Sequence, residues 1–182
     1  MYKNLAATLV AACFSFSASP VFSQSPAPVK PPLKIGFVYV TPVTEAGWVH
    51  QHEEGRKAVA AALGNQVKTT YVESVAEGAD AERVIRDLAS QGNQLIFTPS
   101  FGYMEPTLKV AKDFPNVKFE SITGYKAAPN VSVANARYYE GRYLAGIAAG
   151  RMASSAGYVA GFGIPEVIQG LNAFTLGMRS AN

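Results

Sequence analysis

The sequence predicts an α/β fold in which a parallel sheet is covered by helices on both faces. Short apolar runs rich in β-branched and aromatic residues, typical of strands buried on both faces, occur at residues 33–40 and 94–98. Segments with apolar residues at helical spacing separate such runs. Strand–helix alternation at this spacing indicates parallel strands joined by covering helices.

The strand at 33–40 is followed by a helix that ends at Gly64-Asn65, a pair that commonly terminates helices. Its inward face is expected to consist of Gly55, Ala58, Val59, Ala62 and Leu63. The next strand is expected at 66–72, where Val67, Thr69 and Tyr71 alternate with polar residues.

A second helix and a third strand–helix unit follow. The stripe of the second helix consists of Val84, Ile85, Leu88 and Ala89, and Gly92 ends it. After the strand at 94–98, Pro106 is suited to begin a third helix and Pro115 lies beyond its end. Its inward residues are expected to be Leu108, Ala111 and Phe114. Two further strands are expected at 117–121 and 131–135.

The last part of the chain predicts a helix, a strand and another helix. The helix at 138–152 is expected to bury Gly141, Leu144, Ala145, Ala148 and Met152. A strand at 158–162 and a helix at 166–179 follow, with Val167, Leu171, Phe174 and Met178 on one face. Because a domain seldom ends on an apolar helix without a following strand, the chain is expected to be a fragment.

Residues 1–23 are expected to form a signal peptide. Lys3 precedes an apolar run of 12 residues at 5–16, which is too short to span a bilayer but suits a signal-peptide core. Cleavage is expected after Ser23. The alternative is that Val10-Ala11-Ala12-Cys13 is a lipoprotein box with lipid attached to Cys13, the single cysteine. Residues 24–32 are expected to form a proline-rich linker.

Composition and motifs argue against several function classes. Basic residues are scattered through a chain of formal charge +3, which disfavours nucleic acid as a partner. No nucleophile elbow, phosphate loop, dinucleotide fingerprint or zinc-protease motif occurs, so neither catalytic residues nor a cofactor are expected. His50 and His52 lie two residues apart and point to different helix faces, which disfavours binding of one metal ion by both. His52 is interpreted as a buried or pocket-edge hydrogen-bonding group. Residues 53, 54, 56 and 57 are interpreted as a solvated charged face.

The candidate binding site lies at the carboxyl ends of the strands, where open parallel sheets bind ligands. Gly47 and Trp48, the single tryptophan, follow the first strand at a loop-to-helix junction. The loops after the later strands add further aromatic and hydrogen-bonding residues: Ser100, Phe101, Gly102, Tyr103, Thr123, Tyr125, Asn135 and Tyr138. Aromatic faces with a few polar groups suit a flat neutral heterocycle or a sugar. The alternative for Phe101, Tyr125 and Tyr138 is that they merely cover the sheet edge.

The sequence resembles the basic membrane protein family, which comprises solute-binding components of ABC importers related to the purine nucleoside receptor. The resemblance runs from about residue 34 to 182 and is carried by GWVHQHEEGR at 47–56, EGADAERVI at 77–85, FTPSFGYM at 97–104, YEGRYLAG at 139–146 and IPEVI at 164–168. Two positions depart from the family pattern. The first loop carries Thr41, Thr44 and Glu45 in place of glycines and an aspartate, and Ser121 stands where relatives often have histidine.

The resemblance implies a type I periplasmic-binding-protein-like fold that binds a purine base or nucleoside between two lobes, without catalysis. It implies base stacking on Trp48 and wall contacts from Phe101, Gly102 and Tyr103. Residues 33–155 would form the N-terminal lobe and 156–182 the start of a truncated second lobe. The partner would be an ABC permease in the inner membrane, and the location periplasmic. The alternative functions are a periplasmic sensor that acts on a membrane signalling partner and, less favoured, an α/β hydrolase or transferase.

Overall fold

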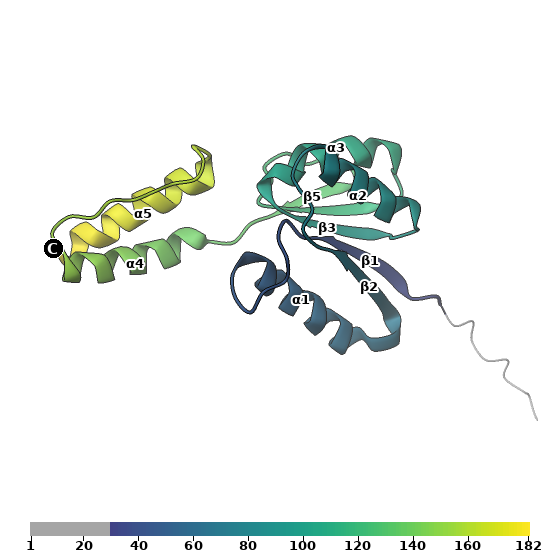
Figure 1. Ribbon diagram of the computed structural model, residues 1–182, viewed down its shortest axis with the longest axis horizontal. Helices are drawn as coiled ribbons and strands as arrows, with labels where there is room; N and C mark the ends of the chain where they lie inside the picture. The colour runs from purple at the N-terminus through teal and green to yellow at the C-terminus, as the bar shows by residue number, and fades with distance from the viewer. Residues whose placement is uncertain (1–29) are drawn as a thin grey trace, which may run out of the picture. The chain divides into compact units, whose positions relative to one another are not determined.

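The computed structural model describes residues 30–182, and its centre is a five-stranded parallel sheet with strand order β2-β1-β3-β4-β5 (Figure 1). The strands are β1 (Leu33–Val38), β2 (Val67–Val72), β3 (Leu95–Pro99), β4 (Lys118–Ile122) and β5 (Val131–Ala134). All four pairings are parallel, so the carboxyl ends of all five strands lie at the same edge. The α/β class predicted from the sequence is confirmed.

Three helices cover the sheet. Helix α1 (Trp48–Leu63) lies on one face, and α2 (Ala79–Ser90) and α3 (Met104–Asp113) lie on the other (Figure 1). A 3₁₀ turn η1 (Gly64–Gln66) joins α1 to β2, and a second, η2 (Phe101–Tyr103), joins β3 to α3. The positions predicted for the five strands of the sheet are correct to within two residues, and α3 begins two residues before Pro106.

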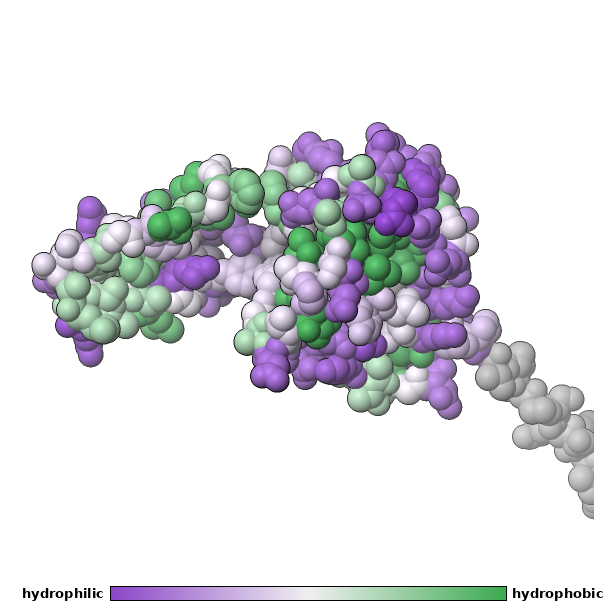
Figure 2. Space-filling model, in the orientation of Figure 1, coloured by the Kyte–Doolittle hydropathy of each residue, from purple (hydrophilic) through white to green (hydrophobic). Residues whose placement is uncertain are grey.

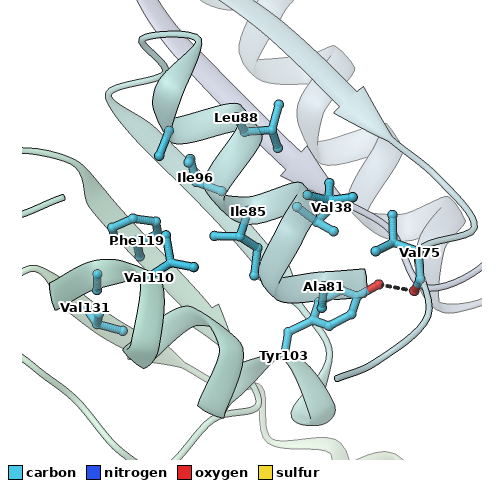
Figure 3. Packing of buried hydrophobic residues seen from close by; sticks show 13 residues of the cluster. Val38, Val75, Ala81, Ile85, Leu88, Ile96, Tyr103, Val110, Phe119 and Val131 are labelled. Carbon is cyan, nitrogen blue, oxygen red and sulfur yellow. Dashed lines mark hydrogen bonds between the residues drawn. The ribbon is translucent and has the colours of Figure 1, made fainter. Parts of the chain in front are cut away.

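The larger core cluster lies between the sheet and the α2–α3 layer (Figure 3). Its strand residues include Val38, Ile96 and Phe119, all at most 1% exposed. The predicted stripe of α2 is confirmed, since Val84, Ile85, Leu88 and Ala89 are all buried. This helix has the most regular apolar periodicity of the sheet-covering helices, and its face is correspondingly the one that sequence predicts best.

The predicted inward face of α1 is wrong. Val59 and Leu63 are 37% and 41% exposed, whereas the buried residues of the helix are Val49 and Glu53. Val49 packs with Ile35, Phe37 and Tyr39 in a smaller cluster. The helix is therefore rotated so that a charged residue, rather than the aliphatic stripe, faces the sheet.

The buried charge of Glu53 is compensated by a local network. The Tyr39 hydroxyl donates to Glu53 Oε2 at 3.1 Å, and the Arg56 guanidinium donates to both carboxylate oxygens at 2.7 and 2.6 Å. Arg56 also donates to Thr69 Oγ1 at 2.7 Å and lies over the Tyr71 ring. The predicted solvated face is thus wrong for Glu53 and Arg56, because a bidentate pair makes burial of the carboxylate tolerable. It holds for Glu54 and Lys57, which form an exposed ion pair.

Helices α4 (Tyr138–Met152) and α5 (Pro165–Ala181) pack against each other as a hairpin (Figure 1). Their backbones approach closely because glycines stand at the contact. A Cβ atom built on Gly146 or Gly177 would overlap the backbone carbonyl of Phe174 or Tyr143, respectively. The predicted buried face of α4 is wrong, since Leu144 and Met152 are 66% and 86% exposed. The aliphatic residues lie outside and the small residues form the contact.

The strand predicted at 158–162 does not form. Val159 and Phe162 are 99% and 70% exposed, and none of the five strands pairs with this segment. A strand requires a neighbour for its backbone hydrogen bonds, and this segment has none among residues 30–182. Tyr158 instead packs edge-on against Phe174 of α5, with ring centroids 5.2 Å apart. The four apolar residues expected on the last helix are half-buried, and the helix begins at Pro165.

The predicted signal peptide, its cleavage after Ser23 and the alternative lipidation of Cys13 lie outside the described residues, as does most of the linker. Within the described part of the chain, no helix is both long and apolar enough to cross a membrane.

Candidate functional site: the carboxyl edge of the sheet

The end of β3 organises the carboxyl edge of the sheet. The Trp48 indole Nε1 donates a 2.7 Å hydrogen bond to the Pro99 carbonyl oxygen. Gly47 precedes Trp48 with φ +94°, a conformation that favours glycine, and this turn lets α1 begin directly at the sheet edge. Trp48 is 36% exposed. Its polar atom is satisfied by the protein while part of its ring remains available to solvent.

Two other rings lie beside Trp48. The His52 imidazole meets the indole edge-on at 4.6 Å between ring centroids, and the Tyr138 ring lies at 5.9 Å. Burial lowers the pKa of His52 below its usual 6.5, so this imidazole is neutral near pH 7. The two rings beside Trp48 are therefore uncharged near pH 7, and His52 is a partly buried neighbour of the indole.

Ser100 connects the edge to the loop before α2. Its hydroxyl donates to Glu77 Oε1 at 2.5 Å. The Glu77 carboxylate lies directly over Gly102, because a Cβ atom built there would overlap the carboxyl carbon and both oxygens. Ser100 and Gly102, both predicted as site residues, therefore place a carboxylate at the sheet edge.

Phe101 and Tyr125 form an aromatic pair, with ring centroids 6.0 Å apart and planes tilted by 31°. The loop that carries Tyr125 turns at Thr123, which has a positive φ of 67°, and Thr123 N donates to Ala134 O. Gly124 packs onto the buried Ser121 hydroxyl, since a Cβ atom there would lie 2.5 Å from Ser121 Oγ. The Ser121 hydroxyl has no hydrogen-bond partner within residues 30–182.

Tyr103 does not lie on the edge. Its side chain is fully buried in the larger cluster, and its hydroxyl donates to the Val75 carbonyl at 2.6 Å (Figure 3). The 3₁₀ turn at Phe101–Tyr103 points this third residue inward, beneath the loop. The prediction that Tyr103 contacts a ligand is corrected accordingly: in this structure its ring belongs to the core.

Asn135 and Tyr138 follow β5. The Asn135 side chain accepts a hydrogen bond from Ala136 N and donates to Glu166 Oε2 at 3.0 Å. Burial raises the pKa of the half-buried Tyr138, and the Glu166 carboxylate raises it further. Trp48, Tyr138 and residues of the hairpin, including Arg142 and Glu166, line a cavity of about 270 Å³.

The sequence-based site omitted Glu77, Arg142 and Glu166. A usable signal existed for Glu77, because the loop after β2 must reach the same edge as the loops after the other parallel strands. No comparable signal existed for the other two, which approach Trp48 and Asn135 through the packing of α4 against α5.

The edge offers stacking surfaces and a few directed polar groups. The exposed faces of Trp48, Phe101 and Tyr125 suit a planar ring, while Glu77 provides a hydrogen-bond acceptor. Within the described residues, no group of three or more histidine, cysteine or acidic side chains is arranged to hold a metal ion. The edge of a parallel sheet with such groups is the place where open α/β folds commonly bind ligands.

The comparison with protein families identifies the chain further. Residues 33–182 match the family described as ABC transporter substrate-binding protein PnrA-like, and the chain belongs to this family. A purine-binding protein of Brucella abortus (strain 2308) is 56% identical over 152 residues, covering 82% of this chain and 43% of the relative. A Haloferax volcanii protein, named for ABC transporter glucose binding, is 40% identical over 148 residues, covering 80% of this chain and 37% of the relative. The chain thus spans less than half the length of these curated relatives.

Solved structures agree with the fold. An ABC transporter solute-binding protein from Aeropyrum pernix K1 superposes with a TM-score of 0.68 at 24% identity, covering 83% of this chain and 44% of that one. Another from Conexibacter woesei gives 0.64 at 25% identity, covering 82% and 51%. The periplasmic-binding-protein-like fold predicted from the sequence is confirmed for about half of such a protein.

Proposed function

We propose that the protein is the extracytoplasmic solute-binding component of an ABC importer and that its ligand is a purine base or nucleoside. The observation that carries this proposal is the Trp48–Pro99 hydrogen bond, which fixes an accessible indole face at the carboxyl edge of the sheet. A planar heterocycle stacks favourably on such a face. The Brucella relative named as purine-binding supports the same ligand class.

The proposed site consists of Trp48, Phe101 and Tyr125 as ring contacts, with Gly47, Ser100, Gly102, Asn135 and Tyr138 around them. We place Tyr103 beneath this surface as a core residue. The protein would bind its ligand without chemical change, since family members are solute-binding proteins. Its partner would be a permease in the inner membrane, after export to the periplasm with cleavage behind Ser23 or lipid attachment at Cys13.

We further propose that the ligand lies between two lobes and that the boundary follows β5, near Asn135. This is earlier than the boundary at residue 156 expected from the sequence. Its support is the packing of α4 against α5, which gives the helix at 138–152 a partner outside the sheet. Closure of two lobes excludes water and adds contacts that a single edge lacks.

The test is the identity of the ligand. Full-length protein purified without added ligand is analysed by mass spectrometry, and adenine, guanosine and glucose are then titrated calorimetrically into the ligand-free protein. We expect the purified protein to retain a purine and to bind adenine or guanosine in preference to glucose. Retention of a sugar, with glucose bound in preference to both purines, would overturn it in favour of the ligand named for the Haloferax relative.

A further inference from the structure

The Glu77 carboxylate is held at the carboxyl edge by two independent features. Ser100 Oγ donates to Oε1 at 2.5 Å, and the missing side chain of Gly102 provides the space that the carboxyl group occupies. A side chain at position 102 would displace it. Glu77 also directly precedes Gly78, the N-cap of α2. The partial positive charge of a helix N-terminus favours an anion at this position.

This carboxylate has unused acceptor capacity. Within the described residues Glu77 forms no ion pair, and its Oε2 accepts no hydrogen bond. The side chain is exposed at the edge. Glu166, a second carboxylate near this edge, differs because it accepts a hydrogen bond from Asn135. An exposed carboxylate without a cation attracts N–H or O–H donors and repels anions.

Glu77 lies at the same end of β3 as the aromatic side chains of the site. Its partner Ser100 lies between Pro99, whose carbonyl accepts the Trp48 indole, and Phe101, which pairs with Tyr125. A planar ring held by these aromatic side chains therefore has a fixed negative charge at the same strand end. Ring binding by stacking is tolerant of substituents, whereas a hydrogen bond to a carboxylate depends on a donor at the ring edge.

We propose that Glu77 is a specificity-determining residue that selects heterocycles with N–H donors on the ring edge and excludes anionic ones. This inference rests on the proposed function, because it assumes a purine at the carboxyl edge. Ser100 and Gly102 then act as positioning residues that hold the carboxylate.

The test compares three probes in full-length protein: adenine, N6,N6,9-trimethyladenine, which has the same ring but no N–H donor, and urate, which is an anion at neutral pH. Titrations use the parent protein, Glu77→Ala, Glu77→Gln and the control Glu54→Ala. The control removes an equally charged carboxylate from the exposed face of α1, where Glu54 pairs only with Lys57.

The parent and the control should prefer adenine over the trimethyl analogue by about tenfold or more, the usual effect of a hydrogen bond to a charged group. Glu77→Ala should reduce adenine affinity by a similar factor, reduce the preference to within about threefold, and bind urate more tightly than the parent. Glu77→Gln should also gain urate binding.

If Glu77 had a purely structural role, Glu77→Ala would weaken the binding of all three probes equally. The preference for adenine over the trimethyl analogue would then stay unchanged, and that result would overturn the inference. Unchanged affinities in a folded Glu77→Ala protein would do the same. If the parent binds neither adenine nor guanosine, the proposed function fails together with the inference. If the parent binds adenine and only the preference is insensitive to Glu77, the proposed function stands and the inference alone is rejected.

Discussion

Trp48 Nε1 and the Pro99 carbonyl oxygen lie 2.7 Å apart, so the first residue of α1 is tied to the last residue of β3. The two residues are 51 positions apart in the sequence. This hydrogen bond satisfies the single polar atom of the indole and fixes the ring plane at the carboxyl edge. A binding surface requires such fixation, because a freely rotating side chain would lose conformational entropy when it stacks on a ligand.

The Glu53 network beneath α1 is expected to stabilise the fold strongly. Replacing Glu53 with Gln should lower the free energy of unfolding by about 3 kcal/mol, since it leaves the Arg56 guanidinium without its anion. The matched variant Glu54→Gln, in an exposed pair with Lys57, should cost under about 1 kcal/mol. Urea denaturation followed by circular dichroism measures both. Equal effects of the two substitutions would contradict the buried role of Glu53.

The same pair predicts a pH dependence. Hydrogen bonds from Arg56 hold the pKa of Glu53 below its usual 4.5. Because the folded-state pKa is the lower one, the stabilisation is complete above about pH 4.5 and is lost as the pH falls through the folded value. The stability difference between parent and Glu53→Gln should therefore shrink in acid. A difference that stays constant from pH 7 to pH 3 would exclude the charged pair as its source.

Two glycines of α4 provide a matched test of the hairpin. A Cβ atom at Gly146 would overlap the Phe174 carbonyl, whereas Gly141 has open space around it. Gly146→Ala should destabilise the α4–α5 contact by about 1–3 kcal/mol, as overpacking does. Gly141→Ala should be neutral or stabilising by up to about 1 kcal/mol, since alanine favours helix. Hydrogen exchange of α4 and α5 amides reports the difference, and similar protection in both variants would contradict the close contact.

Tyr103 is expected to stabilise the core without contributing to ligand binding. Tyr103→Phe removes the hydrogen bond to the Val75 carbonyl and leaves a buried acceptor unpaired, at a cost of about 1–2 kcal/mol in stability. Ligand affinity should remain within about twofold of the parent, because the hydroxyl lies away from the edge. Thermal unfolding and calorimetric titration measure the two quantities. Weakened ligand binding with unchanged stability would return Tyr103 to the binding surface.

The sequence predicted the sheet and the α2 face because both depend on local periodicity. Ile96, Phe119 and Leu88 stand in apolar patterns that have one consistent interpretation. The orientation of α1 could not be predicted in the same way. Its buried Glu53 depends on Tyr39, 14 residues earlier in the chain, and an isolated charge gives no periodic signal.

The candidate site was predictable as a location but not as a set of side-chain contacts. The rule for parallel sheets correctly located Trp48 and Phe101 at the carboxyl edge. It could not reveal that the turn at Phe101–Tyr103 buries Tyr103, nor that the Glu77 carboxylate lies directly over Gly102.

The buried face of α4 was also predicted wrongly, because close contacts at its glycines determine which side packs against α5. Much of the visible hairpin surface in Figure 2 consequently carries apolar and weakly polar residues.

Calorimetric titration of adenine into full-length protein and its Trp48 variants measures directly whether a purine stacks on the indole. Trp48→Ala removes the indole face and should weaken binding by about 1–3 kcal/mol, the usual range for stacking of a base on an aromatic side chain. Trp48→Phe keeps a ring but loses the hydrogen bond to Pro99, so its affinity should lie between those of the parent and Trp48→Ala. If Trp48→Ala remains folded and binds adenine as tightly as the parent, the purine does not stack on Trp48, and the carboxyl edge is not the proposed binding surface.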